Sequence, residues 1–448
     1  MMQTQEMTFI NSPKPHILML TTHGVHQWKV VPGLTDTGGQ NVFVNQFSQE
    51  LVHQGYKVTI INRGGYPHPV TGKPQIGCVY KDSYQRIIYL EDGLPQFVRK
   101  EDMGDRVFQL ASNLKTIIKN ENMVFDLIIS HYWDAAVVGE LIREGNHLQS
   151  PHVWVPHSLG AIKKKNVAES EWPSLRIDER IQNEQKILST VDFVASTSPL
   201  ISESLRQDYS YEGPTLWLPP CVSTLRYHPH LVPPNAPVWS MLSQASGLPV
   251  DEIQQMKIIT EISRTDTTKR KDILLRAFAQ LRKSHPDTFL VITINNNNHP
   301  TGAELMQLMS DLNIRQNTAV LGSVWDHLPD IYALSHIYCT PSIMEGFGMS
   351  AQEAAATGLP VVSSSLVPFA VQYLYGGAEL SVPDPIAVGQ GAIIVQPDDV
   401  EGFAQALDLL LSDERMRQVM GRKAYQITIP QFTWPNMVEQ FLKSLSNR

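Results

Sequence analysis

The segment SIMEGFGMSAQEAAATGLP, from Ser342 to Pro360, contains the pattern that decides the fold. An apolar run precedes it and another follows it. Between them, Gly346 and Gly348 form a turn ahead of an alanine-rich stretch of helical character. The order strand, turn, helix and strand is typical of a parallel sheet covered by helices. Backbone N–H groups at the start of such a helix are free to bind a diphosphate.

Two glutamates, Glu345 and Glu353, belong to the same segment. Glu345 is expected on the turn, where its carboxylate can accept hydrogen bonds from sugar hydroxyls. Glu353 is expected one to two helical turns later, directed toward a ribose diol. The spacing alone is also compatible with a capped surface helix that carries two ordinary glutamates.

Similar short runs of valine, isoleucine and leucine recur along the chain, separated by segments of helical periodicity. The first set comprises HILMLTT from His16, VTIIN from Val58, RIIYLE from Arg86, LIISH from Leu127, HVWVPHS from His152, FVAST from Phe193 and TLWLPP from Thr215. The second set comprises KIITEIS from Lys257, TFLVITI from Thr288, TAVLGSV from Thr318, IYCTPS from Ile337, PVVSSS from Pro360 and AIIVQP from Ala392. The pattern predicts an α/β protein of two doubly wound, Rossmann-like domains that face each other across a cleft.

The domain boundary is expected near a proline-rich stretch, from Pro219 to Met256, because proline interrupts both periodicities. We therefore assign residues 1–225 to an N-terminal domain and residues 226–429 to a C-terminal domain. The helix within residues 430–448 is expected to cross back to the first domain. Functional residues are sought at strand-to-helix turns, because doubly wound sheets bind ligands at the carboxyl ends of their strands.

The composition limits the class of protein. The 448 residues carry 36 Lys and Arg against 44 Asp and Glu, a formal net charge of −8, which argues against nonspecific binding to nucleic acid or anionic membranes. Three scattered cysteines, Cys78, Cys221 and Cys339, fit neither a disulfide framework nor a structural zinc site. No signal peptide and no apolar run of ~18 residues is found. We expect a soluble cytoplasmic protein.

Several well-known catalytic signatures are absent from the sequence. Gly72-Lys73 is followed by Pro74 and not by Ser or Thr, no GxGxxG follows a strand, and neither HExxH nor paired CxxC occurs. The residues around Ser158 read VPHSLGA and not GxSxG. P-loop NTPases, Rossmann dehydrogenases, zinc hydrolases and serine hydrolases therefore lose support.

Arg264 and Lys269 follow a predicted strand and precede an amphipathic helix, within EISRTDTTKRKDILLRAFAQL. Two cations at the carboxyl end of a strand can neutralise the charge on a departing diphosphate, as a bound metal does elsewhere. For Arg270 and Lys271, an ordinary position at a solvated helix start is also plausible. This alternative is weaker for Arg264 and Lys269, which flank the turn.

The first domain contains two weaker signals. The double glycine of DTGGQ, from Asp36 to Gln40, again presents N–H groups at a helix start, although such a sequence also forms ordinary turns. His157 lies near the end of the run HVWVPHS and precedes the basic residues 163–165. A single histidine is more often structural than functional, but its position at a strand end favours a role in a site.

These elements, taken in order, resemble the GT-B retaining glycosyltransferases of family 4 over nearly the whole chain. The resemblance rests on EGFG with Glu353, on SR with Lys269, on the Gly-Gly loop and on HSLG. The motifs DTGGQ, HYWDA from His131, HSLG with Lys163, and RIQNE from Arg180 are most similar to members that transfer glucose from UDP-glucose to fructose 6-phosphate. UDP is the expected nucleotide, with ADP and GDP left open.

The resemblance implies roles for individual positions on the donor side. Arg264 and Lys269 would hold the diphosphate, Glu353 the ribose hydroxyls, and Glu345 and His157 the transferred glucose. We therefore regard His157, Arg264, Lys269 and Glu345 as the catalytic residues. Gly39 and the backbone of the glycine-rich turn in the second domain would complete the donor site. The residues of this turn are Gly346, Phe347, Gly348, Met349 and Ser350.

On the acceptor side, the resemblance implies that Gly39 and Gln40 contact the fructose unit. Lys100, Lys163 and Arg180 would bind its 6-phosphate. Three cations from three separate segments form a good site for a dianion. Each of them is also compatible with an ordinary surface position.

The family further implies front-face attack through an oxocarbenium-like transition state, with the leaving diphosphate as proton acceptor. The products would be sucrose 6-phosphate and a nucleoside diphosphate. No cofactor or metal is expected, so activity should survive EDTA. Because no DxDx[TV] signature follows the second domain, free sucrose would require a separate phosphatase.

Two segments depart from the family pattern. Residues 363–374 read SSSLVPFAVQYL where relatives often carry GGPxEI, and residues 293–300 lack the usual glycine of that turn. Three other readings stay open. They are a different phosphorylated or small polyol acceptor, a noncatalytic nucleotide-sugar sensor, and a membrane-associated transferase with a lipid contact at residues 163–165.

Overall fold

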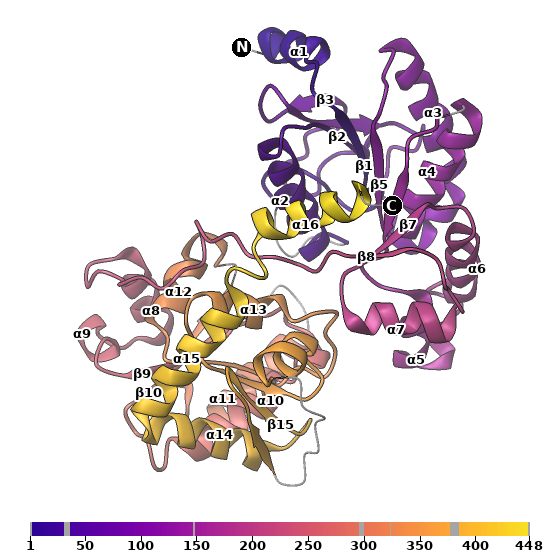
Figure 1. Ribbon diagram of the computed structural model, residues 1–448. Coiled ribbons are helices and arrows are strands. Elements are labelled where there is room, and N and C mark those ends of the chain that lie inside the picture. The colour runs from indigo at the N-terminus through magenta and orange to yellow at the C-terminus, as the bar shows by residue number, and fades with distance from the viewer. Residues whose placement is uncertain are drawn as a thin grey trace. The chain divides into compact units, whose positions relative to one another are not determined.

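The computed structural model describes residues 2–30, 36–146, 148–294, 300–322, 324–376 and 385–446. The chain forms two compact units, the first comprising Met1–Pro219 with Met437–Arg448 and the second Pro220–Asn436. Each unit is an α/β structure with its own sheet and its own cores (Figure 1).

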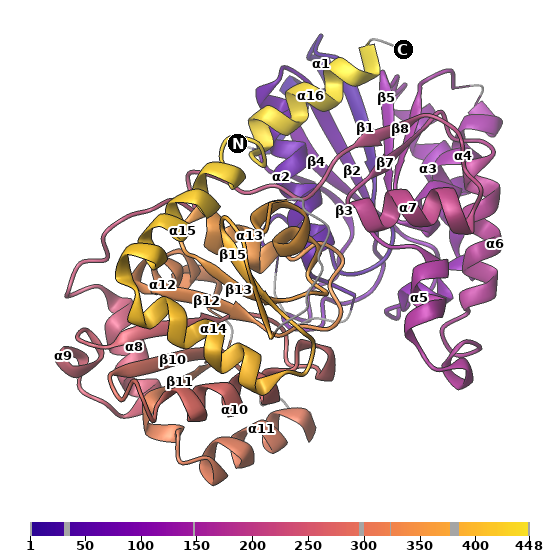
Figure 2. The ribbon, with the colours of Figure 1, turned by 60° about the horizontal axis from the view of Figure 1, so that its bottom comes forward.

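In the first unit, the described residues form a sheet of eight strands in the order β3-β4-β2-β1-β5-β6-β7-β8. All neighbours are parallel except β3, which is antiparallel to β4 at the edge. Figure 2 shows these strands with helices on both sides. The strands are β1 (His16–Leu20), β2 (Lys57–Arg63), β3 (Gly77–Tyr80), β4 (Gln85–Leu90), β5 (Leu127–His131), β6 (His152–Val155), β7 (Phe193–Ser196) and β8 (Thr215–Trp217).

The helices of the first unit include the C-terminal one. The ring of Phe441 on that helix lies edge-on to the ring of Phe47, with 5.4 Å between centroids, so the end of the chain packs on α2. The helices are α1 (Met2–Asn11), α2 (Gly39–His53), α3 (Val107–Asn120), α4 (Trp133–Asn146), α5 (Gly160–Asn166), α6 (Ile177–Leu188), α7 (Pro199–Asp208) and α16 (Trp434–Ser446).

In the second unit, the described residues form seven strands in the order β11-β10-β9-β12-β13-β15-β14, parallel except for the edge strand β14. The strands are β9 (Lys257–Glu261), β10 (Thr288–Thr293), β11 (Thr318–Leu321), β12 (Ile337–Thr340), β13 (Val361–Ser364), β14 (Ile386–Val388) and β15 (Ala392–Val395). The helices are α8 (Pro237–Ser246), α9 (Val250–Ile253), α10 (Lys271–Leu281), α11 (Pro300–Asp311), α12 (Leu328–Leu334), α13 (Met349–Ala356), α14 (Val400–Ser412) and α15 (Glu414–Thr428).

The central strands are mostly apolar because both of their faces are covered. On β9, Ile258 belongs to the core on one face of the sheet and Ile259 to the core on the other face. Successive side chains of a strand point to opposite faces, so neighbouring positions must both be apolar. Each predicted run overlaps a strand, and the predicted doubly wound fold class is confirmed.

The proline-rich stretch that we expected to connect the domains is part of the second unit. It contains α8, whose Pro237 occupies the first turn, where a missing N–H costs nothing. Val238 and Leu242 of this helix are fully buried in the core of the unit. The sequence predicts the domain boundary at residue 225, whereas the structure divides the chain after Pro219.

No helix in the described ranges is both long enough and apolar enough to cross a bilayer. Of the two atypical segments, residues 295–299 lie outside the described residues. The other segment forms the end of β13 and a π-helical turn, Ala370–Leu374. Its Phe369 and Tyr373 pack against Phe347 and Phe432, so this segment forms the wall behind the glycine-rich turn.

Candidate active site

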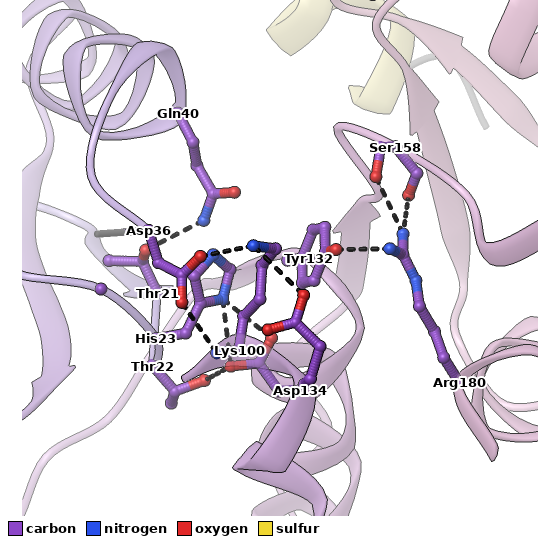
Figure 3. Close-up of polar contacts among 12 residues, drawn as sticks. Thr21, Thr22, His23, Asp36, Gln40, Lys100, Tyr132, Asp134, Ser158 and Arg180 are labelled. Carbon is purple, nitrogen blue, oxygen red and sulfur yellow. Dashed lines mark hydrogen bonds and ion pairs between the residues drawn. The ribbon is translucent and has the colours of Figure 1, made fainter. Parts of the chain in front are cut away.

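The predicted acceptor residues lie near the carboxyl edge of the first sheet. Gly39 begins α2, and the backbone N–H of Gly38 donates to Asn41 Oδ1 at 2.9 Å, which fixes the start of the helix. Gln40 Nε2 donates to the hydroxyl of Thr21, just beyond β1, at 3.3 Å. Figure 3 shows Gln40 above the cluster of residues that follows β1.

The three predicted phosphate-binding cations, Lys100, Lys163 and Arg180, line one pocket of the first unit. Arg176 and the ring of Tyr132 line it as well. Four cations face two carboxylates, those of Glu101 and Glu179, so the lining carries an excess of positive charge. An anion such as a phosphate group carries the complementary charge.

Each lysine of the pocket has an acidic neighbour. Lys100 Nζ forms an ion pair with Asp36, and Glu101 Oε1 lies 3.3 Å from the ammonium groups of both Lys100 and Lys163. Burial lowers the pKa of Lys100, but the hydrogen bond and charge of Asp36 outweigh it and raise the pKa overall. Burial lowers the pKa of Lys163, with Glu101 opposing the shift. The acidic groups therefore hold the cations in place.

Arg180 is almost fully buried, with 5% of its surface exposed. Its guanidinium pairs with Glu184 at 2.8 Å, donates to the hydroxyl of Tyr132, and donates to the carbonyl and hydroxyl oxygens of Ser158 at 2.6 and 2.9 Å. Figure 3 shows its guanidinium bonded to both Ser158 and Tyr132. Arg180 thus lines the pocket and also fixes two other polar groups of the lining.

His157 lies two residues beyond the end of β6, in a left-handed backbone conformation with φ 55°. Its Nε2 shares a hydrogen bond of 2.9 Å with Nδ1 of His131, and the two rings are stacked. Burial, and after it the nearby His23, lower the pKa of His157 to about 3. His157 is therefore a neutral hydrogen-bonding group at physiological pH and no permanent cation.

A second polar cluster lies beside the pocket and was not singled out from the sequence. His23 Nδ1 lies 3.0 Å from Asp134 Oδ1, and the hydroxyl of Thr22 donates to Asp134 Oδ2 at 2.5 Å (Figure 3). Asp134 is completely buried. It belongs to the HYWDA motif together with Tyr132, whose φ of 76° is a strained value of the kind that collects at functional sites.

Apart from Gly39 and His157, the predicted donor residues lie in the second unit. Lys269 Nζ donates to Glu345 Oε1 at 2.7 Å and to the carbonyl of Met344 at 3.4 Å, and Lys269 is 6% exposed. The backbone N–H of Ile343 donates to the carbonyl of Thr268 at 2.8 Å, which joins the two loops. Arg264 has 82% of its side chain exposed, with Asp266 3.9 Å away. The structure therefore brings Lys269 and Glu345 together and leaves Arg264 in solvent.

The glycine-rich turn leads into α13. Gly348 caps this helix with φ 102°, and a Cβ at this position would meet Val367 Cγ1 at 2.6 Å. Phe347 is buried, and its carbonyl accepts a hydrogen bond of 2.7 Å from Phe369 N–H. Met349 and Ser350 form the first turn of the helix, where backbone N–H groups have no partner within the helix.

Glu353 lies on α13 against two tyrosines. The hydroxyl of Tyr332 donates to Glu353 Oε2 at 3.3 Å. Burial raises the pKa of Glu353 to about 7, against the hydrogen bonds of Tyr227 and Tyr332. The carboxyl group is held in a defined position, as a residue that binds a diol requires.

The charge run after Arg264 contains one residue with an unexpected environment. The sequence is compatible with a solvated Lys271 at a helix start. In the structure Lys271 pairs with Glu261, and both side chains are 1% exposed. Its ammonium also donates to the carbonyl of Ser263 at 3.3 Å, at the start of the loop that bears Arg264 and Lys269. Arg270 faces outward and pairs with Asp272 and Asp398.

A comparison with protein families matches both units. The model described as Glycosyl transferases group 1 matches residues 250–427, and the model described as Glycosyltransferase Family 4 matches residues 37–226. Together with two doubly wound sheets whose turns carry the groups described above, these matches define the class. The chain is a glycosyltransferase of the family 4 type with the GT-B fold.

Among individual proteins, the chain resembles sucrose-phosphate synthase from Thermosynechococcus elongatus. The two structures share a TM-score of 0.76 at 22% identity, over 97% of this chain and 99% of the other. Mannosylfructose-phosphate synthase of Agrobacterium fabrum is 27% identical, over 97% of this chain and 92% of the relative. D-inositol 3-phosphate glycosyltransferase of Corynebacterium diphtheriae is 26% identical, over 91% of this chain and 90% of the relative.

The residue roles and the absence of a metal requirement stay predictions. In the described ranges, no three His, Cys, Asp or Glu side chains are grouped in a way that could hold a metal ion.

Proposed function

We propose that this glycosyltransferase is a sucrose-phosphate synthase that transfers glucose from UDP-glucose to fructose 6-phosphate with retention of configuration. The observation that carries the proposal is the pocket in which Lys100, Lys163 and Arg180 come together from three separate segments. Arg180 is buried and the two lysines are only partly exposed, so none of the three is an ordinary surface cation. A phosphorylated acceptor gives them a common ligand.

The roles of the donor residues follow from their environments. Lys269 is buried beside Glu345, so its ammonium is preorganised and can stabilise the departing diphosphate without reorganisation. Arg264 is exposed, so it can move onto the diphosphate when the donor binds. Glu345 and the neutral His157 would hold the sugar hydroxyls, and Glu353 the ribose.

The proposed reaction breaks the bond between the sugar C1 and the diphosphate and forms the new bond from C1 to the acceptor hydroxyl oxygen. The hydroxyl proton passes to the leaving diphosphate, which accounts for a reaction without a carboxylate nucleophile. Sucrose 6-phosphate and UDP are the products. A separate phosphatase would release free sucrose.

A second candidate is the transfer of mannose to the same acceptor. It is favoured by the 27% identity with mannosylfructose-phosphate synthase. The names of this relative and of the structural neighbour indicate different transferred sugars. In both, the product is a disaccharide phosphate that contains a fructose unit. The acceptor pocket is therefore the same in both candidates, and the sugar-binding groups Glu345 and His157 would distinguish them.

Product formation from a matrix of substrates tests the proposal. The donors are UDP-, ADP- and GDP-linked glucose and mannose, and the acceptors are fructose 6-phosphate, fructose and inositol 3-phosphate, with mass spectrometry of the products. We expect sucrose phosphate from UDP-glucose with fructose 6-phosphate and no product with fructose. Mannosylfructose phosphate as the main product would establish the second candidate. Product from inositol 3-phosphate alone would overturn the acceptor assignment.

Binding of a donor without turnover on any acceptor would instead indicate a nucleotide-sugar sensor. The same assays in EDTA test the expectation that no metal is required. Loss of activity in EDTA that added Mg²⁺ restores would contradict the electrostatic role given to Arg264 and Lys269.

A further inference from the structure

The first unit contains a second cavity, at the edge of the sheet opposite the candidate active site. Its volume is about 400 Å³, within the range of small-molecule sites. It lies at the amino ends of β1, β2 and β5, where His16, Lys57 and Asp126 line it, and α1 contributes Phe9 and Ile10. Neither the family matches nor the proposed transfer reaction assigns a role to it.

The charges of the lining are unbalanced. Lys14, Lys57 and Arg86 face the cavity together with the carboxylates of Glu121 and Asp126, so three cations oppose two anions. The sixth titratable group, His16, is neutral, because burial, followed by the charges of Lys57 and Arg86, lowers its pKa to about 3. The cavity therefore carries one net positive charge.

The two carboxylates are already engaged with other groups. Glu121 pairs with Nη1 of Arg86 at 2.8 Å, and Asp126 Oδ2 accepts the backbone N–H of His16 at 2.7 Å. Arg86 also donates to the hydroxyl of Thr59 at 3.0 Å, so its guanidinium is held rigidly.

Lys14 and Lys57 have no carboxylate partner among the described residues. Among the described residues, neither Lys14 nor Lys57 has a carboxylate oxygen within 4 Å of its ammonium group. Lys57 Nζ donates to the carbonyls of Phe9 and Ser12 at 3.2 and 3.0 Å, and Lys14 Nζ lies 3.9 Å from the centre of the Tyr84 ring. Burial lowers the pKa of Lys57, the charge of Arg86 lowers it further, and Asp126 opposes the shift. An ammonium group in this position is stabilised by an anion.

We propose that this cavity is a binding site for a small organic phosphate, separate from the active site. Lys14 and Lys57 would bind the phosphate, with Arg86 supplying further positive potential. The exposed apolar side chains of Ile10 and Val124 would contact the body of the ligand, and Asn122 is available for a hydroxyl group. A phosphate dianion matches two ammonium groups better than a carboxylate monoanion does.

The ligand would also attach α1 to the sheet. Phe9 is 1% exposed, and the guanidinium of Arg86 lies 4.5 Å from the centre of its ring. The carbonyls that accept from Lys57 belong to the last turn of α1 and to the residue that follows the helix. The simpler role for Lys57 is therefore a cap for the end of α1. Lys14 makes no such contact with the helix, so it separates the two roles.

The test measures binding of phenyl phosphate by isothermal titration calorimetry to the full chain carrying Lys100→Ala and Lys269→Ala. These two substitutions weaken the other predicted phosphate sites. We expect one binding site, and we expect Lys14→Gln and Lys57→Gln each to weaken binding by about tenfold or more, as for the loss of a charged hydrogen bond. Benzoate, which has a similar ring and a single charge, should bind more weakly.

The matched control is Lys119→Gln, which removes an exposed positive charge from α3 close to Glu121 but outside the cavity lining. This variant should bind phenyl phosphate as the parent does. The proposal is overturned if the parent does not bind phenyl phosphate, or if Lys14→Gln binds it unchanged. Tighter binding of benzoate would overturn the phosphate assignment. The outcome is independent of the transferase assay, because the parent of this series already lacks two predicted active-site cations.

Discussion

The environment of Lys269 makes it the single residue from which the largest catalytic effect is expected. It is buried next to Glu345 and within reach of the Met344 carbonyl. A preorganised charge of this kind contributes roughly 3 to 4 kcal/mol to transition-state stabilisation. Lys269→Ala should therefore lower kcat by about 100-fold or more without unfolding the protein. Steady-state kinetics and circular dichroism measure the two effects.

Arg276→Ala is the control for Lys269→Ala. It removes an exposed cation from α10, a short distance along the chain, in a position where alanine favours the helix. This variant should keep the parental kcat. Turnover of Lys269→Ala close to the parental value would remove the residue from the mechanism.

Glu353 should make the stability of the protein depend on pH. Burial raises its folded-state pKa to about 7, from an ordinary value of 4.5. Below pH ~4.5 the group is protonated in both states, and the full contribution to stability is present. As the pH rises toward 7, the unfolded state loses the proton more readily than the folded state does, so this contribution is lost.

Urea unfolding between pH 4.5 and 7.5 measures the effect. Relative to the parent, Glu353→Gln should become progressively more stable as the pH rises through this window, because it carries no proton to lose. The control is Glu304→Gln, an exposed position on α11, for which the difference from the parent should stay constant. A constant difference for Glu353→Gln as well would show that its carboxyl group is solvated in the folded protein.

At the scale of elements, α13 depends on one glycine of its turn. Gly348 has φ 102° and no space for a Cβ, whereas Gly346 is outside the left-handed region and has nothing within 4 Å of a Cβ. Gly348→Ala should therefore reduce the free energy of unfolding by about 1 to 3 kcal/mol. It should also raise the KM for the donor, since the N–H groups of the turn would shift.

Gly346→Ala is the matched variant for that measurement. It adds the same methyl group to the same turn, and it should leave the stability almost unchanged. Equal destabilisation by both substitutions in urea unfolding would contradict the assignment of the strained position to Gly348.

The elements differ in how far the sequence predicts them. The strands β1 and β9 are visible as apolar runs because both of their faces are buried. The edge strand β3 was not predicted, because it is only four residues long and alternates exposed with partly buried positions. The sequence predicts a linker where helix α8 lies, because prolines interrupt the periodicity. Pro237 is nevertheless compatible with the first turn of a helix.

The residues of the candidate site also differ in how far the sequence predicts them. Glycine-rich turns and strand ends can be recognised locally, so Gly348, Lys269 and Glu345 could be proposed as site residues from the sequence. The partners of His23 and Lys271 depend on contacts across the sheet or within a loop, for which no spacing rule exists. Asp134 stands in a motif that was noticed, but its burial beside His23 follows only from the tertiary structure.

At the scale of the whole molecule, the predicted acceptor groups belong to the first unit and nearly all the donor groups to the second. Each substrate should therefore respond to substitutions in its own unit. Lys163 offers a test, because the next two lysines have other neighbours. Lys163 lines the cationic pocket near Glu101, whereas Lys164 pairs with Asp178 and Lys165 with Asp208.

Lys163→Gln should raise the KM for fructose 6-phosphate by about tenfold or more, as expected for the loss of one charged hydrogen bond to the phosphate. The KM for UDP-glucose should stay unchanged, because Lys163 belongs to the first unit, whereas nearly all the predicted donor groups belong to the second. Lys165→Gln, which removes the same charge from an exposed position two residues away, should change neither value. If both variants weakened the acceptor equally, the effect would arise from the general charge of α5, and the pocket would lose its role in phosphate recognition.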